Sequence, residues 1–169
     1  MTTLIDNKLF VVFLAPFLLG VITIFGFAPY SFTLLNFFTF SSLLFLIFTI
    51  KKRTTSKYRK KKSNRYFFYL GCAFGFGFFL FGNYWISISL THDEMLKDLI
   101  PYALILVPLF LSLFFGISIL LVGPFAEKNF YFILLFSLVF AIFEFLRGNI
   151  LTGFPWNLVS YTWSWSLEI

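Results

Sequence analysis

The residues best suited to chemistry are an acid and a base near the end of a strongly apolar run. Glu144 and Arg147 lie three residues apart, so on a helix they share one face and can form an ion pair. At the bilayer centre each charge would cost about 2.5–3.5 kcal/mol, but Arg147 can extend its charge toward the interface. Two interpretations stay open: the pair ends a helix, or it forms the polar floor of a site at the membrane surface.

The segment that follows, residues 147–169, is rich in glycine, proline and tryptophan. Gly148 and Gly153 permit a break in the helix, Pro155 enforces it, and Trp156 suits a membrane interface. Such a loop can hold an acyl chain or merely cover a helix end. The candidate residues for a lipid or substrate floor are therefore Glu144, Arg147, Pro155, Trp156 and Tyr161.

Two other sets of residues could react or bind a metal, but their surroundings argue against it. Cys72 lies deep in an apolar run, without the nearby cation or histidine that a nucleophilic thiolate needs, so we expect a packing residue. His92, Asp93 and Glu94 are adjacent in a short polar segment, and adjacent residues rarely converge on one ion. We expect no catalytic residue, no metal site and no cofactor in these 169 residues.

The basic residues are concentrated in one segment, KKRTTSKYRKKKSNR, at 51–65. It holds nine of the thirteen lysines and arginines and no acid. Nucleic-acid binding would favour aromatic residues between the bases, and only Tyr58 is present, so we do not expect it. The segment is typical of a cytoplasmic loop that sets membrane topology, with some attraction to anionic lipids.

The composition places the chain in a membrane. It is 60% hydrophobic and 12% charged, with a mean hydropathy of +0.91, which exceeds what a soluble domain can bury. A backbone in lipid must satisfy its own hydrogen bonds, so the apolar runs predict helices. We predict a single all-α integral membrane domain over 1–169, with about five transmembrane helices before the interfacial loop. The expected spans are 9–27, 32–50, 66–90, 99–122 and 130–146.

Charge and small residues predict the orientation and one packing contact. With the basic loop 51–65 in the cytoplasm, the N-terminus is cytoplasmic and the loop 147–169 is external. Gly71 and Gly75 form a small-xxx-small pattern, which lets two membrane helices approach closely.

Three stretches resemble one bacterial family. FEFLRGNILTGFPWNLVSY, at 143–161, is similar to the membrane region of apolipoprotein N-acyltransferases, which carry an E-F-x-R-G pattern followed by T-G-F-P-W. GFAPY, at 26–30, resembles the turn after the first span of that family. GFGFFLFGNYWISIS, at 75–89, resembles its third span, and all three occur in the family's order.

The resemblance implies a multi-pass protein of the bacterial inner membrane. The family transfers an acyl chain from a phospholipid to the N-terminal diacylglyceryl-cysteine of lipoproteins, so membrane phospholipid and lipoprotein substrates are the expected partners. Its glutamate, lysine and cysteine lie in a nitrilase-like extracytoplasmic domain after the spans seen here. No residue in 1–169 matches that triad, so we expect this chain alone to be inactive.

Several forms of such a protein stay open at this point. The chain would be a fragment, a truncated gene product or one half of a split enzyme, whose partner would be a separately encoded C-terminal half. The alternative from another class is a non-catalytic membrane partner or assembly subunit. A small transporter is disfavoured, because no paired broken helices or midplane charge relay are visible.

Overall fold

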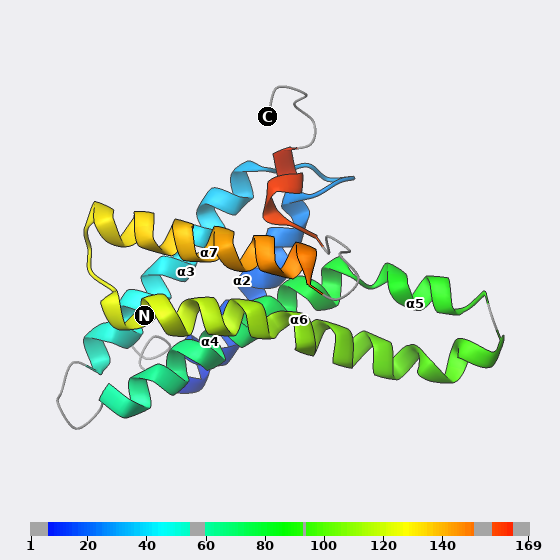
Figure 1. Cartoon of the computed structure of the whole chain (residues 1–169), viewed down its shortest axis with the longest axis horizontal. Coiled ribbons are helices and arrows are strands. Elements are labelled where there is room, and N and C mark those ends of the chain that lie inside the picture. The colour runs from blue at the N-terminus through cyan, green and yellow to red at the C-terminus, as the bar shows by residue number, and fades with distance from the viewer. Residues whose placement is uncertain (1–6, 55–59, 93, 151–156, 164–169) are drawn as a thin grey trace.

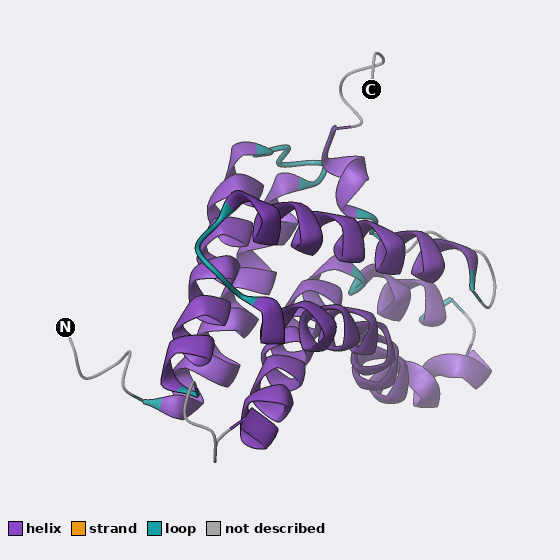
Figure 2. Cartoon of the chain, turned by 60° about the vertical axis from the view of Figure 1, so that its left-hand side comes forward, coloured by secondary structure: helices purple, strands orange, loops and turns teal. Residues whose placement is uncertain are grey.

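A computed structural model describes residues 7–54, 60–92, 94–150 and 157–163. Within these ranges every regular element is helical, without a strand, which confirms the predicted all-α class (Figure 2). Four helical segments are long and apolar enough to cross a membrane, and a shorter apolar segment precedes them. The four correspond to α3 (Leu34–Arg53), α4 (Lys60–Gly82, of which Asn64–Gly82 is the apolar part), α6 (Ile100–Val122) and α7 (Phe130–Asn149).

The shorter N-terminal segment is continuous but changes its helical pitch twice. A π-helix, η1 (Phe10–Leu14), leads into α2 (Ala15–Thr23), and a 3-10 turn, η2 (Ile24–Gly26), ends it. Pro16 is the second residue of α2, directly after the π-helical turn, so its missing N–H falls where the helical hydrogen-bond pattern changes. The Phe10–Gly26 segment is ~26 Å long at ~1.5 Å per residue, which is close to the hydrocarbon thickness of a bilayer.

A tight turn then reverses the chain into α3. The Ala28–Pro29 peptide bond is cis, and the Ser31 N–H donates to the Phe27 carbonyl at 2.9 Å. The Phe32 N–H donates to the Phe25 carbonyl at 2.9 Å, which ties the residues just before α3 to η2.

Helix α4 is the centre of the domain, packed between α2 and α6. Figure 1 shows α4 and α6 side by side. Small residues permit this approach: a Cβ on Gly71 would lie 2.5 Å from the Phe115 carbonyl oxygen, and one on Gly75 would lie 2.9 Å from the Ser112 Cα.

Phenylalanine fills the space around this contact. The Phe115 ring, on α6, has four aromatic neighbours whose centroids lie between 5.0 and 5.7 Å away, at tilted or edge-on angles. These neighbours are Phe74, Phe78, Phe79 and Phe140. Such pairs add to the energy of burial, so the cluster joins α4, α6 and α7 into one core.

The observed helix limits differ from the predicted ones in several places. Helix α3 extends to Arg53 and α4 begins at Lys60, inside the predicted loop 51–65, and α7 continues through Gly148 to Asn149, past the predicted end at 146. The run at 66–90 is divided, because α4 ends at Gly82 and a separate short helix, α5 (Trp85–Leu90), follows. Asn83 is buried at this break, and its N–H still donates to the Phe79 carbonyl at 2.9 Å. Helix α5, a 3-10 segment η3 (Glu94–Leu99) and the start of α6 extend together beyond the other helices (Figure 1).

The two ends of α3 lie at opposite ends of the domain. Its C-terminal Lys51 donates from Nζ to the Pro124 carbonyl in η4 (Gly123–Phe125), the turn between α6 and α7. Its N-terminal end lies beside the last described helical turn, η5 (Val159–Trp163). The basic residues at the end of α3 are therefore a full helix length away from η5.

Candidate functional site

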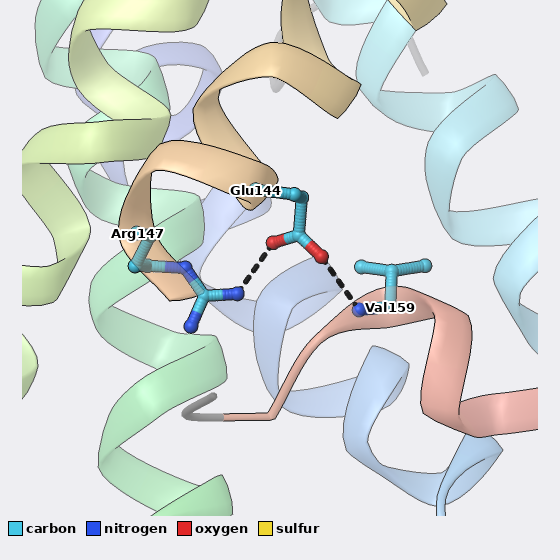
Figure 3. Close-up of polar contacts among 3 residues, drawn as sticks. All are labelled: Glu144, Arg147 and Val159. Carbon is cyan, nitrogen blue, oxygen red and sulfur yellow. Dashed lines mark hydrogen bonds and ion pairs between the residues drawn. The ribbon is translucent and has the colours of Figure 1, made fainter. Parts of the chain in front are cut away.

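Glu144 holds together the end of α7 and the C-terminal turn. Its Oε1 lies 2.5 Å from Arg147 Nη2, one helical turn away on α7. Its Oε2 accepts a hydrogen bond of 2.7 Å from the backbone N–H of Val159, the first residue of η5. Figure 3 shows the carboxylate between these two donors, so one side chain fixes η5 against α7.

Arg147 points into the protein. Its side chain is 1% exposed and that of Glu144 is 14% exposed. The guanidinium carbon lies 4.8 Å from the centroid of the Phe79 ring on α4, a cation–π distance. Arg147 therefore does not extend toward the interface as expected. Its charge lies between the Glu144 carboxylate and the face of the Phe79 ring instead.

A second set of contacts attaches η5 to α3. The Thr33 hydroxyl donates to the Thr162 carbonyl at 3.1 Å, and Thr162 is 2% exposed. The rings of Phe37 and Trp163 meet edge to face with centroids 6.1 Å apart. Since Glu144 holds the other end, η5 links α3 to α7.

Below η5, a groove of about 720 Å³ runs between α3 and α7. Its walls are mainly apolar, from Phe37, Phe40 and Leu44 on α3 and from Ile133, Phe136 and Phe140 on α7. Asn36, Glu144, Ser160 and Thr162 supply polar groups near η5, and Ser41 on α3 and Ser137 on α7 add hydroxyls further along the walls. This shape suits a hydrocarbon chain with a polar end.

Two buried asparagines near this end of the domain lack partners. Asn36 is 7% exposed and Asn83 is 2% exposed, and neither amide makes a hydrogen bond within the described part of the chain. Neither residue is predicted from the sequence to be a site residue. Their sequence context could have identified them, since a polar side chain inside an apolar membrane helix is rare and often functional.

Of the other residues that the sequence pointed to, some lie outside the described ranges and others lie within them but away from the groove. Pro155 and Trp156 lie outside the described residues, as do Gly153 and Asp93. Tyr161 lies in η5 with 45% of its surface exposed and does not line the groove. Cys72 is half-buried on α4, and the described residues contain no group of three histidine, cysteine or acidic side chains that could hold a metal.

A buried pair of hydroxyls supports the same end of the bundle. The Thr23 hydroxyl donates to the Thr39 hydroxyl at 3.0 Å, and Thr39 donates in turn to the Asn36 carbonyl at 3.2 Å. Thr39→Val keeps the side-chain volume and removes both bonds, so we expect a loss of about 1 kcal/mol in unfolding free energy. Thermal unfolding in detergent measures it.

The matched control for this substitution is Thr49→Val on the same helix. The Thr49 hydroxyl donates only within α3, to the Phe45 carbonyl at 2.9 Å, and should be nearly neutral. Equal unfolding temperatures for the two variants would contradict a stabilising role for the Thr23–Thr39 pair.

Comparison with known proteins gives one consistent result. The family model described as "Apolipoprotein N-acyltransferase N-terminal domain" matches residues 19–169. The apolipoprotein N-acyltransferase of Rickettsia typhi is 38% identical over 153 residues, which is 89% of this chain and 28% of that protein. The same enzyme of Rickettsia prowazekii is 37% identical over 152 residues, 88% of this chain and 28% of that protein. A shorter match, to the apolipoprotein N-acyltransferase of Brucella melitensis, is 38% identical over 93 residues, 54% of this chain and 18% of that protein. The chain thus spans a little over a quarter of the length of its two Rickettsia relatives.

Proposed function

The chain belongs to the apolipoprotein N-acyltransferase family through the N-terminal domain of that family, and from this premise we propose its function. It provides the membrane part of an enzyme that transfers an acyl chain from a phospholipid to the N-terminal diacylglyceryl-cysteine of lipoproteins. Its partners in that role are membrane phospholipid and lipoprotein substrates in the bacterial inner membrane.

The observation that carries the proposal is the bridge made by Glu144. Because both carboxylate oxygens accept from donors on α7 and η5, η5 is fixed at the closed end of the groove. Glu144 and η5 thus form a fixed polar end to the apolar groove, called the floor below. Such an end suits a lipid whose ester group must be held at a defined depth.

Within this proposal the floor positions lipid and does not itself react. Both Glu144 oxygens already accept hydrogen bonds, from Arg147 and Val159, which favours a positioning role, and the groove lining has hydroxyl and amide groups but no cysteine, lysine or histidine. The acyl-transfer chemistry therefore falls to parts of the enzyme outside the described residues.

The charge distribution supports one orientation. The basic residues Lys51, Lys52 and Arg53 end α3, and the floor lies at the other end of the same helix. With the basic end in the cytoplasm, the floor faces the external leaflet. Tagging residues near position 57 and near position 160 for accessibility in intact cells tests this orientation.

A chimera tests the function itself. We expect residues 1–169, exchanged for the matching segment of the Rickettsia typhi relative, to restore lipoprotein N-acylation in a bacterial strain depleted of its own enzyme. The same residues expressed alone should give no N-acylated product. Mass spectrometry of the N-terminal lipopeptide of a lipoprotein distinguishes the di- and triacylated forms.

Two results would contradict the proposal. One is an N-acylated lipopeptide formed by purified residues 1–169 alone. The other is a chimera that inserts into the membrane, resists protease like the parent enzyme and still forms no product.

A further inference from the structure

The last turn of α4 contacts both segments that carry the floor. Phe79 and Gly82 are three residues apart, so they lie on one face of α4. The Phe79 ring centroid lies 4.8 Å from the Arg147 guanidinium carbon. A Cβ on Gly82 would lie 2.2 Å from Nδ2 of Asn157, so the Asn157 amide packs directly on the glycine. One helical turn therefore supports α7 at Arg147 and the C-terminal segment at Asn157.

These contacts close a ring. Arg147 pairs with Glu144 on α7, and Glu144 Oε2 accepts from the Val159 N–H at 2.7 Å (Figure 3). Asn157 lies two residues before Val159 and returns the chain to Gly82 on α4. A single hydrogen bond would let η5 pivot about Glu144. The ring prevents this, because any pivot must also move Asn157 away from α4.

The backbone of Asn157 suits this position. Its φ angle is +37°, in the left-handed region that asparagine adopts more readily than most residues. This conformation turns the chain just before η5 begins at Val159. Glycine would adopt it at least as readily but would leave Gly82 without its contact. The side chain of Asn157 thus adds something that the turn alone does not need.

Gly82 leaves the space in which this amide lies. A Cβ there would meet two side-chain ends, Nδ2 of Asn157 and, at 2.8 Å, Cδ1 of Ile24. Both can move without shifting a helix, in contrast to the backbone atoms that face Gly71. A methyl group at position 82 therefore displaces the Asn157 amide and leaves the helices in place.

We propose that Asn157 is a positioning residue for acyl transfer. Packed on Gly82, it sets where η5 and the Glu144 carboxylate lie, and turnover depends on this placement more than folding does. The role in turnover rests on the proposed function; the contact between Asn157 and Gly82 does not.

Cysteine pairs test the contact without any measurement of activity. In membranes containing the chimera, Gly82→Cys with Asn157→Cys should form a disulfide on oxidation with copper phenanthroline. The reason is that the Gly82 Cβ position lies 3.4 Å from Asn157 Cγ. Ala73→Cys with Asn157→Cys should form none, since Ala73 lies ~13 Å further along α4 at ~1.5 Å per residue. Mass spectrometry identifies the linked peptide. A disulfide in both pairs, or in neither, would overturn the contact.

Gly82→Ala tests the role in turnover. In the chimera, we expect kcat for N-acylation of a diacylated lipopeptide to fall about tenfold, because a small misplacement of positioning groups slows the reaction strongly. The KM for the lipopeptide should stay within about twofold, since the change acts on geometry in the transition state. The unfolding temperature should change little, because only side-chain ends are displaced and alanine favours a helix. A lower unfolding temperature with unchanged kcat would assign the contact a purely structural role and overturn the inference.

Gly148→Ala is the matched control. Gly148 lies at the end of α7 and also faces the C-terminal segment, but its nearest neighbour is Leu158 Cδ1 at 3.7 Å. The methyl has room there, so kcat and KM should not change. Equal losses of kcat in Gly148→Ala and Gly82→Ala would show that the Asn157 amide is not the group that matters.

A double variant tests whether the two residues act together. Asn157→Gly alone removes the side chain from Gly82 and should also lower kcat. Gly82→Ala combined with Asn157→Gly puts a methyl where the amide was, and glycine tolerates the left-handed backbone. The double variant should therefore be several-fold more active than either single variant. Losses that simply multiply would overturn the positioning role.

The positioning role and the proposed function can fail separately. If the chimera acylates lipoproteins and Gly82→Ala keeps its kcat, the positioning role is wrong and the function stands. If the disulfide forms but the unsubstituted chimera gives no product, the contact is real, and both the function and the role in turnover fail.

Discussion

Replacing Glu144 by alanine is expected to lower the unfolding free energy by about 3–5 kcal/mol, because it removes the carboxylate that lies 2.5 Å from a buried charge. The Arg147 side chain is 1% exposed and lies against the Phe79 ring, so water cannot replace the lost carboxylate without rearrangement. The same change removes the acceptor of the Val159 N–H. Thermal unfolding in detergent measures the loss, and limited proteolysis reports release of η5.

A second ion pair of the same spacing provides the control. Glu94 and Lys97 are also three residues apart, with a 3.4 Å separation, but their side chains are 93% and 50% exposed. Glu94→Ala should change the unfolding free energy by less than about 0.5 kcal/mol. Equal effects of Glu94→Ala and Glu144→Ala would show that Arg147 reaches solvent and that the buried arrangement is wrong.

A double variant separates the effect of the Arg147 charge from the effect of losing the hydrogen bond between Glu144 and the Val159 N–H. Glu144→Leu with Arg147→Met removes both charges and retains much of the volume, so most of the stability should return. The Val159 N–H would still lack its acceptor, so η5 should remain sensitive to protease. Recovery of protease resistance along with stability would mean that η5 is held by its α3 contacts alone.

The helical class could be predicted from composition, and the pairing of Glu144 with Arg147 from spacing. Both rest on local rules: apolar runs of membrane length form helices, and residues three apart on a helix meet. The location of Arg147 could not be predicted. Its burial depends on Phe79, which is distant in sequence and reaches α7 only because α4 and α7 share the aromatic core.

The groove and its polar end show the same limit. Hydropathy assigns Phe37, Phe40 and Phe140 to membrane helices but does not tell which of them face a neighbour and which face lipid. Asn36 was visible as a polar residue in an apolar run, yet its lack of a partner follows only from the packing around Gly26 and η5. Similarly, the end of α4 at Gly82 lies inside an apolar run whose length suggested one continuous helix.

Replacing Gly71 by alanine is the second change with a large expected effect. The new Cβ would lie 2.5 Å from the Phe115 carbonyl oxygen and 2.7 Å from the Gly116 Cα. Both are backbone atoms, so no side chain can rotate away, and α4 and α6 must separate. We expect a loss of about 1–3 kcal/mol in unfolding free energy, measured by thermal unfolding in detergent.

Two further glycines make the prediction quantitative. A Cβ on Gly75 would meet the Ser112 Cα at 2.9 Å, whereas one on Gly148 would have nothing closer than Leu158 Cδ1 at 3.7 Å. The loss of unfolding free energy on substitution by alanine should therefore be smaller at Gly75 than at Gly71. Gly148→Ala should be neutral or stabilising. Helix propensity alone predicts a gain of about 1 kcal/mol at all three positions, because each lies in a helix. A stabilised Gly71→Ala variant would thus show that propensity exceeds packing here and that α4 and α6 are not in close contact.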